Sequence, residues 1–381
     1  MRFFPRRFTL AISLILMAAT NLSAEPIRAY IGTSTPKPGE EGSKGIYTAT
    51  FDTATGTWSE TALAAECASP GFLAVHPNGQ WVYAVHAVRR PDGKSEVSAF
   101  AIQSDGTLAL LNSVETGGHG PCHVSIDPTN GLVFLANYGG QSVASFKIQS
   151  DGRLSDSVSV VKREGSSVNE RRQKQPAPHS VYPHPTLPLL LNADLGTDEV
   201  VAYAYDRASG KLDENPSASA KLAILGGGPR HLAITSDGKR IYSANEMHGT
   251  VSAFQFDGKT FTEFQQSKIG PEDATSAAEI RLHPSGKFLY ASTRAPTGGI
   301  GIFSINDADG KLTPAGFVPS GGNVPRNFEV TSDGRWLLAA NSGTSNIAVF
   351  AIDPATGALT QKADADLQVP QPMCVRFVEN Q

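Results

Sequence analysis

Short runs of alternating apolar and polar residues recur along most of the chain. In one clear example, residues 227–235 and 240–246 alternate on either side of a turn that contains Asp237-Gly238. A period of two predicts β-strands, and Asp-Gly between two such runs favours a hairpin. The first run opens with Arg230-His231, and the second closes on Glu246. The pattern therefore predicts a β-hairpin with charged residues gathered at one end.

The same hairpin recurs as a repeat. Each copy has a Pro/Gly entry, a first strand, a turn, a second strand, and then a third and a fourth strand. The copies start about 47 to 57 residues apart. Four short strands at this spacing indicate a β-propeller blade, and the period of two excludes a helical solenoid. The first strands begin near Gly71, Cys122, His179, Arg230, Ala278, Arg326 and Met373.

The two ends of the chain predict how the propeller closes. Residues 28–32, 45–51 and 57–61 resemble a second, third and fourth strand without a first, whereas 372–378 is a first strand with nothing after it. Pairing the two ends completes a seventh blade and removes an exposed sheet edge. We therefore predict one all-β domain, residues 25–381. It is a seven-bladed β-propeller with four antiparallel strands per blade, in which the C-terminal strand pairs with the N-terminal blade.

Residues 1–24 have the layout of a secretory signal peptide. Arg2, Arg6 and Arg7 precede an apolar run over residues 8–19, and Ser23-Ala24 offers a small-residue cleavage site. The run is short for a membrane span, although an uncleaved anchor is the alternative. The arginine pair hints at twin-arginine export, but the residues after it fit that signal poorly. We expect a periplasmic or secreted protein without stable membrane insertion after cleavage.

Charge and cysteine content exclude several classes of function. The formal net charge of −4 becomes −7 once the three arginines of the signal are removed, and no block of like charge indicates a nucleic-acid partner. Cys67, Cys122 and Cys374 show no spacing typical of a zinc site. At most one disulfide could form in an exported protein, and the sequence does not select the pair.

Two stretches interrupt the repeat. Residues 162–178 contain five cationic side chains and no apolar periodicity, which fits either a solvated surface loop or a lid over a site. Residues 34–44 form a Pro/Gly/Glu-rich loop within the blade that joins the two ends.

Propeller geometry brings one end of every first and second strand to the same face, around the mouth of the central channel. Residues far apart in the sequence therefore converge there. At the first-strand starts these are Phe72, Cys122, His123, His179, Ser180, Arg230, His231, Glu279, Arg326, Asn327 and Cys374. At the second-strand ends they are His86, Asn137, Tyr138, Asp194, Asn245, Glu246, Thr293, Arg294 and Asn341.

This ring of side chains suits an anionic substrate and acid/base chemistry. Arginine offers paired donors to carboxylate or phosphate, and His and Glu exchange protons near neutral pH once their pKa values are tuned. Arg230, Glu246 and Arg294 fall where other blades carry no charge, and burying them unpaired would be costly.

Other polar residues have a structural interpretation. The recurrent Asn137, Asn245 and Asn341 would satisfy loop backbone groups, and His123 is either a hydrogen-bonded channel residue or part of the site. Three histidines of the first turns belong to the opposite face and are expected to be structural, namely His76, His184 and His283.

With these residues placed, the chain resembles the seven-bladed β-propeller lactonase family of bacterial 6-phosphogluconolactonases, which is related to carboxy-cis,cis-muconate lactonizing enzymes. The resemblance covers nearly all of the chain after residue 24. It rests on motifs that are specific when taken together: Tyr30-Ile31-Gly32-Thr33, Gly45-Ile46-Tyr47, Pro178-His179-Ser180, Gly228-Pro229-Arg230-His231, Asn245-Glu246, Ala278-Glu279-Ile280, Thr293-Arg294 and Pro325-Arg326-Asn327-Phe328.

The resemblance implies two groups of site residues. His179, Arg230, Glu246 and Arg294 fall at the positions proposed for the active site, and His123, His231, Glu279 and Arg326 line the same mouth as substrate-binding residues. Two features depart from the family pattern. The export signal does not fit a phosphorylated lactone made in the cytoplasm, so another sugar lactone is open, and Arg326-Asn327 stands where the family tends to have Arg-Gly.

The first hypothesis is a metal-independent lactonase, a hydrolase acting on the ring ester of a sugar lactone without a cofactor. Water attacks the carbonyl carbon, Glu246 or His179 takes its proton, and Arg230 and Arg294 stabilise the oxyanion. The sequence contains no Gly-x-Ser-x-Gly elbow, which disfavours a covalent serine route.

Three alternatives stay open at this point. One is a cycloisomerase that closes a carboxylated muconate, and another is a non-catalytic secreted propeller that binds a ligand. A third is a calcium-dependent lactonase with Glu246, Asp194, Asn245 and Asn341 as oxygen ligands. The Arg and His residues at the same mouth would repel a divalent ion, so this alternative ranks low. We expect a monomer whose partner is a small anionic or sugar lactone.

Overall fold

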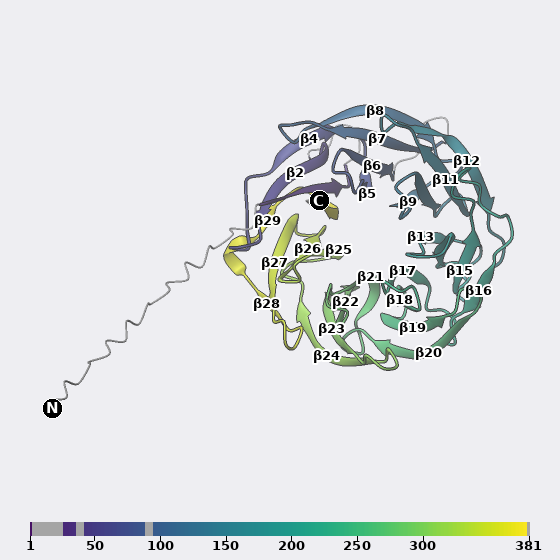
Figure 1. Cartoon of the computed structure of the whole chain (residues 1–381). Helices are drawn as coiled ribbons and strands as arrows, with labels where there is room; N and C mark the ends of the chain where they lie inside the picture. Colours follow the sequence, from purple (N-terminus) through teal and green to yellow (C-terminus); the bar gives the residue numbers. More distant parts are fainter. Residues whose placement is uncertain (2–25, 36–41, 88–93, 379–381) are drawn as a thin grey trace.

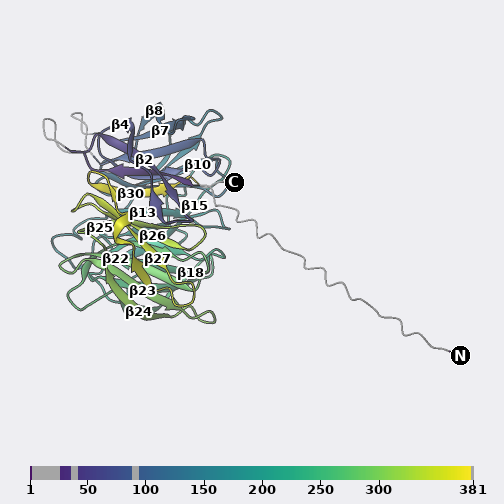
Figure 2. The same ribbon diagram turned by 90° about the vertical axis from the view of Figure 1, so that its left-hand side faces the viewer.

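Seven antiparallel sheets surround a central channel in the computed structural model (Figure 1), which describes Met1 and residues 26–35, 42–87 and 94–378. Six sheets are made of consecutive strands, and the seventh joins the two ends of the described chain. The prediction of a seven-bladed β-propeller is confirmed. Figure 2 shows the same ring from its edge.

Each blade is named here after its innermost strand. The β5, β9 and β13 blades contain β5 (Pro70–Val75), β6 (Trp81–His86), β7 (Glu96–Ile102), β8 (Leu108–Glu115), β9 (Pro121–Ile126), β10 (Leu132–Asn137), β11 (Ser142–Ile148), β12 (Leu154–Lys162), β13 (Pro178–Pro183), β14 (Leu189–Asp194), β15 (Glu199–Ala204) and β16 (Ala218–Lys221). The β17 and β21 blades contain β17 (Pro229–Ile234), β18 (Arg240–Asn245), β19 (Thr250–Phe256), β20 (Phe261–Lys268), β21 (Thr275–Leu282), β22 (Phe288–Ala295), β23 (Gly299–Ile305) and β24 (Leu312–Pro319). The β25 blade contains β25 (Pro325–Val330), β26 (Trp336–Asn341), β27 (Asn346–Ile352), β28 (Leu359–Gln361), the short 3-10 helix η1 (Ala363–Ala365) and β29 (Leu367–Gln368).

The closing blade is assembled from both ends of the described chain. The C-terminal β30 (Pro372–Phe377) is innermost and pairs with β1 (Ile27–Thr33), so that Ile31 faces Val375. Next comes β2 (Gly45–Asp52), and the outer edge consists of β3 (Thr57–Trp58) and β4 (Ala62–Glu66). The C-terminal strand closes the ring as predicted. Of the fourth strand predicted over 57–61, only β3 forms, and most of the outer edge is β4, which begins after the predicted end.

Hydrophobic clusters fill the spaces between neighbouring blades, because the middle strands of each blade are apolar on both faces and are covered on both sides. A repeated hydrogen bond adds to this packing. A buried tyrosine on a second strand donates to the carbonyl of a turn glycine in the next blade, as Tyr83 does to Gly152 and Tyr242 to Gly310. Gly152 has a φ of +87°, and a Cβ there would collide with the Trp81 ring, so the turn requires glycine.

Several expectations concern the ends and the cysteines. Residues 2–25 lie outside the described residues, so the signal peptide stays a prediction. Among the residues that the structure does describe, no helix is long and apolar enough to cross a membrane. Cys67, Cys122 and Cys374 are all free thiols.

Residues 163–177, between β12 and β13, are tied to the face of the ring by buried charges. Arg163 bonds to Asp194 at 2.9 Å and to Glu199 at 2.6 Å, and Asp194 also accepts the backbone N–H of Ala177. Ser167 donates to Asp198 at 2.5 Å. Of the two interpretations of this stretch, a segment covering part of the mouth fits these contacts better than a solvated loop.

Candidate functional site

A β-bulge at the same end of every innermost strand builds the site. In the β17 blade, Pro229 faces Asn245 and His231 faces Ala244, so Arg230 has no residue opposite it. A bulge re-aims the extra side chain, and the repeat turns one position per blade toward the channel mouth. The bulges occur at Gly71, Cys122, His179, Arg230, Ala278 with Glu279, Arg326 and Met373, the positions where the repeat begins.

Glu246 is the centre of the mouth, just after β18. Its Oε2 atom lies 3.0 Å from Nε of Arg230 and 3.0 Å from Nη2 of Arg294, and its Oε1 lies 2.9 Å from Nη2 of Arg172. Burial alone would raise the pKa of this carboxyl, but the three guanidinium groups outweigh burial and lower the pKa to about 2. Glu246 is therefore an ionised and weakly basic carboxylate that holds three arginines in place.

Those arginines are fixed by further contacts. Arg230 donates through Nη1 to the carbonyl of Ala278 at 2.6 Å, and Arg294 donates through Nε to the carbonyl of Ser276 at 3.0 Å. Arg172 also donates to the hydroxyl of Tyr138 at 3.1 Å. The guanidinium planes are thus oriented before any substrate binds, which is the arrangement that stabilises developing negative charge.

His179 lies beside this cluster and is 6% exposed. Its Nδ1 atom is 3.9 Å from the sulfur of Cys122, and its ring meets that of Tyr138 edge-on at 5.5 Å. Within the described residues, Nε2 has no hydrogen-bond partner. Burial, followed by the charge of Arg230, lowers the pKa of His179 well below its usual value. The imidazole is therefore neutral at pH 7, and one of its two ring nitrogens can accept a proton.

Arg326 makes no hydrogen bond or ion pair within the part of the chain that the structure describes. Burial and repulsion from Arg230 lower its pKa to about 10, so it keeps its charge at neutral pH. It borders a cavity of about 320 Å³ that Arg172, His179, Glu246 and Arg294 also line. Arg230 and Arg326 line a small neighbouring pocket together. Four guanidinium groups, those of Arg172, Arg230, Arg294 and Arg326, therefore surround the single carboxylate of Glu246, and the mouth carries three positive charges in excess.

A packed layer of rings lies immediately beneath the mouth. The rings of Phe72 and His123 are 4.3 Å apart, and His231 approaches both of them, at 5.6 Å and 5.3 Å. The Nδ1 atom of His123 accepts the backbone N–H of Val181 at 3.4 Å. The structure thus gives His123 a packing and hydrogen-bonding position below the mouth, whereas His231 borders the small pocket beside Arg230.

Glu279 also lies below the mouth and is fully buried. Its Oε1 is 3.0 Å from Nδ1 of His231, and Arg281 is 3.8 Å from its Oε2. Deeper in the channel, Arg281 approaches Glu329 at 3.3 Å and Arg376 bonds to Glu329 at 2.7 Å. Glu279, for which the family resemblance implies a substrate-binding role, is therefore held in an ionic network and is not among the residues that line the cavity of about 320 Å³.

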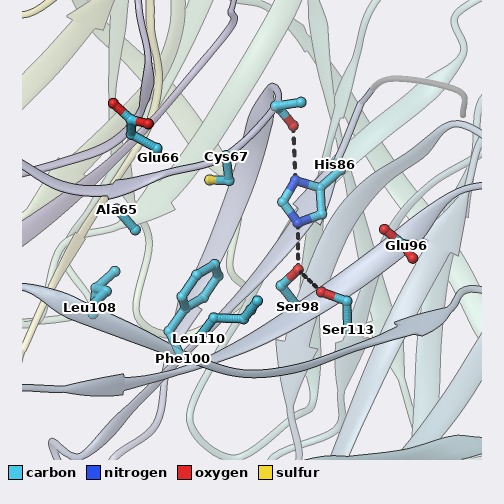
Figure 3. A pocket seen from close by; sticks show the side chains of 11 residues that line it. Ala65, Glu66, Cys67, His86, Glu96, Ser98, Phe100, Leu108, Leu110 and Ser113 are labelled. Carbon is cyan, nitrogen blue, oxygen red and sulfur yellow. Dashed lines mark hydrogen bonds between the residues drawn. The ribbon is translucent and has the colours of Figure 1, made fainter.

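Some predicted ring residues face away from the mouth. The second-strand residue Asp194 is fully buried under residues 163–177. Figure 3 shows that His86 points into a side pocket between the closing blade and the β5 blade, where it bonds to Ser98 at 2.7 Å and Ser98 bonds to Ser113. The ring of His86 also bonds to the carbonyl of Ala68 at 2.9 Å. The repeat therefore predicts which backbone positions lie near the mouth, but it does not predict where the side chains at those positions point.

The recurrent asparagines and turn histidines behave as structural residues. Asn137 donates to the carbonyl of Thr116 and Asn341 to that of Ser320, while Asn245 donates to Thr250 and Ser252. Each turn histidine uses Nε2 to reach a carbonyl of the next blade, which for His76, His184 and His283 is that of Asn130, Gly238 and Gly334.

Several charged residues of the site and channel were not singled out from the sequence. Arg172 comes from the stretch without periodicity, so no pattern placed it against Glu246. Arg281, Glu329 and Arg376 each stand two positions after a predicted channel residue. Because alternate residues of a strand share a face, this spacing was a signal that could have found them.

The donor set at the mouth does not resemble a divalent-cation site. Among the described residues, no three or more His, Cys, Asp or Glu side chains group closely enough to hold a metal ion. Of the four ligands considered for calcium, Glu246 faces three arginines and Asp194 is paired with Arg163. The arginines would repel a divalent ion from this carboxylate.

Comparison with known proteins gives consistent matches over nearly the whole chain. A family model described as Lactonase, 7-bladed beta-propeller matches residues 28–377. A 6-phosphogluconolactonase of Bacillus subtilis (strain 168) is 33% identical, over 92% of this chain and 97% of the relative. One of Formosa agariphila is 32% identical, over 89% of this chain and 96% of the relative.

Solved structures agree with these matches. A candidate 6-phosphogluconolactonase from Bacteroides fragilis is 35% identical with a TM-score of 0.86, over 95% of this chain and 99% of that one. The periplasmic gluconolactonase of Pseudomonas aeruginosa is 27% identical with a TM-score of 0.84, over 93% of this chain and 99% of that one.

Proposed function

The chain belongs to the seven-bladed β-propeller lactonase family and is a lactone-hydrolysing enzyme, and on that premise we propose that its substrate is a sugar lactone with an anionic group. Relatives named 6-phosphogluconolactonase and gluconolactonase support a sugar lactone. The anionic group is inferred from this chain's own mouth.

The observation that carries the proposal is the excess positive charge around the cavity. Glu246 neutralises one equivalent of charge among Arg172, Arg230, Arg294 and Arg326, and Arg326 has no partner in the described residues. Partly buried cations without counter-ions destabilise the free protein, and an anionic ligand removes that cost. A phosphate or carboxylate on the lactone supplies the missing charge in a form that guanidinium groups bind through paired hydrogen bonds.

We assign the general base to His179. Its ring borders the cavity and its Nε2 atom has no hydrogen-bond partner among the described residues, so the tautomer with the proton on Nδ1 can accept there. Both oxygens of Glu246 instead accept from arginines, and its pKa of about 2 makes it a poor proton acceptor. In this mechanism His179 takes a proton from water as the water oxygen bonds to the lactone carbonyl carbon. Arg230 and Arg294 stabilise the oxyanion. The ring C–O bond then breaks, and the imidazolium returns the proton to the alkoxide.

We further propose that this hydrolysis needs no metal ion. The supporting argument is that the oxyanion is met by guanidinium groups, which occupy the role of a Lewis acid. Activity of the purified protein should persist after treatment with a chelator and dialysis, and loss that a divalent ion restores would reject this part of the proposal.

The cellular location is also a proposal. The arginine-rich, apolar N-terminus and the relative described as periplasmic support export of a mature protein beginning near Glu25. Intact-mass analysis of the exported protein would test the cleavage site. We also propose that the protein is a monomer, and the molar mass from sedimentation would test this.

The function is tested by acid release from purified protein given 6-phosphogluconolactone and glucono-δ-lactone, with the uncatalysed rate subtracted. We expect hydrolysis, with a higher kcat/KM for the phosphorylated lactone. His179→Asn should lower kcat with little change in KM, since it removes the base and keeps most of the side-chain volume. Absence of hydrolysis of either lactone by correctly folded protein would reject this substrate class.

A further inference from the structure

We propose that Glu279 is a positioning residue for catalysis: it fixes the tautomer of His231 and, through His231, the orientation of the Arg230 guanidinium. This inference rests on the proposed function, in which Arg230 meets the oxyanion. Glu279 itself touches neither the cavity nor the reacting atoms.

A continuous chain of contacts links the three side chains. Oε1 of Glu279 lies 3.0 Å from Nδ1 of His231, and Nε2 of His231 lies 3.3 Å from Nη1 of Arg230. Arg230 then reaches Glu246 through Nε at 3.0 Å. Each of these four side chains is at most 8% exposed, so solvent competes little for the contacts.

The two ends of this chain determine where the imidazole carries its proton. An ionised carboxylate only accepts hydrogen bonds, so Nδ1 facing Glu279 must carry the hydrogen. A guanidinium group only donates, so Nε2 must present its lone pair to Arg230. Burial lowers the pKa of His231 to about 4 despite the opposing effect of Glu279, which keeps the ring neutral at pH 7. The Nδ1–H tautomer is the one that satisfies both contacts.

Glu279 is itself held from several sides. Its Oε1 accepts the backbone N–H of Ile280 at 3.0 Å, and its Oε2 accepts the side-chain amide of Asn327, with Arg281 nearby. Asn327 in turn accepts the N–H of Val375 from the closing strand at 2.9 Å. Burial would raise the pKa of Glu279, but Arg281 and then His231 hold it far below its usual range. The carboxylate is thus ionised and immobile.

This arrangement explains two features that the hydrolytic mechanism does not use. Asn327, which stands where the family tends to have glycine, gives Glu279 a partner from the neighbouring blade. His231 transmits the position of that carboxylate to the mouth. An outer group that sets the tautomer and orientation of an inner one commonly changes activity about 10- to 100-fold when it is removed.

The decisive variant is Glu279→Gln, and Glu329→Gln is its matched control. A glutamine at 279 keeps the shape but can direct an N–H at Nδ1, which moves the histidine proton to Nε2 and sets two donors against each other at Arg230. Glu329 is a second carboxylate of the same channel, on the adjacent blade, bonded to Arg281 and Arg376 and not to His231. Glu329→Gln therefore removes a similar charge and leaves the contacts from Glu279 through His231 to Arg230 in place.

Steady-state kinetics on the better lactone should separate the two variants. For Glu279→Gln we expect kcat to fall about tenfold or more with KM within about twofold of the parent. For Glu329→Gln we expect kcat within about twofold of the parent, even if its thermal midpoint falls. A parental kcat in Glu279→Gln, or equal losses of kcat in both variants, would overturn the proposal.

A second measurement tests the geometry in the parent protein without relying on activity. In the parent protein, labelled at the histidine ring nitrogens, NMR should show His231 protonated at Nδ1 and unprotonated at Nε2 at pH 7. Disappearance of the signal in His231→Asn assigns it. A proton on Nε2, or a charged ring, would overturn the proposal even if the protein hydrolyses lactones. A parent with the expected tautomer but no lactonase activity would instead reject the proposed function.

Discussion

The channel carries two groups of charges that differ in their balance. At the mouth, Arg172, Arg230, Arg294 and Arg326 surround Glu246 alone. Deeper in the channel, two arginines and two glutamates pair with one another: Arg281, Arg376, Glu279 and Glu329. Both groups are built by the two inner strands of the blades and the segments beside them, yet one has three positive charges in excess and the other has none.

This difference indicates that the charges at the mouth serve ligand binding, whereas the deeper charges serve the stability of the fold. A balanced buried network satisfies its own members and has no affinity left for a ligand, whereas unbalanced charge destabilises the free protein and favours an anion that restores the balance. The excess charge, and not the mere presence of charged side chains, therefore marks the functional end of the channel.

The largest expected effects come from exchanging one arginine in each group for methionine. Arg230→Met should lower kcat about a hundredfold, because an oriented donor at the oxyanion is lost. Arg376→Met should leave kcat nearly unchanged but lower the free energy of unfolding by about 1–3 kcal/mol, because the partly buried Glu329 loses a partner. Turnover per folded molecule and denaturant unfolding measure both quantities. The comparison fails if Arg230→Met turns over normally or if both variants lose only stability.

Acid unfolding tests the role assigned to Glu246. Its pKa is about 2 in the folded protein and about 4.5 as a reference value, so its stabilising effect is present above pH 4.5 and is lost as the pH falls toward 2. The parent should be more stable than Glu246→Gln at pH 7, and this advantage should shrink by about 3 kcal/mol across that range. A constant difference between the two proteins would show that the carboxylate is not held by the arginines.

Arg172 should have a smaller effect because it is half-exposed. Arg172→Met is expected to raise KM for the phosphorylated lactone about threefold, to leave KM for the neutral lactone unchanged, and to weaken the salt dependence of the former, since solvent and salt screen an exposed charge. Lys174→Met, from the same segment, is the control and should change neither. A rise in KM for both lactones would indicate a packing defect.

The smallest expected effect is that of pH on kcat/KM of the parent protein. The pKa of His179 lies well below 6.5, so the neutral base persists as the pH is lowered from 8 to 6, and kcat/KM should stay level over that range after correction for uncatalysed hydrolysis. A steep loss between pH 7 and 6 would mean that the base titrates near neutral pH and that another group, or a charged His179, is involved.

The fold could be predicted from the sequence because its signals are local. Alternation with period two identifies strands, and the unpaired first strand over 372–378 identifies the closure. The starts of the repeat, such as Arg230 and Arg326, coincide with the β-bulges, so the ring of bulged residues was also predictable. Each of these features depends on residues within one blade.

The rest of the site depends on contacts between blades, which no local pattern encodes. Asp194 turns under residues 163–177 because Arg163 of that segment pairs with it, and His86 turns to Ser98. Arg172 reaches Glu246 from a segment without periodicity. The choice between Glu246 and His179 as base also needed the structure, because it depends on which lone pairs are already occupied.

The most direct test of the unbalanced mouth is the ratio of kcat/KM for 6-phosphogluconolactone to kcat/KM for glucono-δ-lactone, measured in the parent and in Arg326→Met. Arg326 is the cation without a partner among the described residues, and its removal breaks no ion pair. The account predicts that the ratio falls about tenfold or more in the variant, with a thermal midpoint that does not drop. An unchanged ratio in a folded Arg326→Met protein would contradict the claim that the excess charge at the mouth selects the substrate.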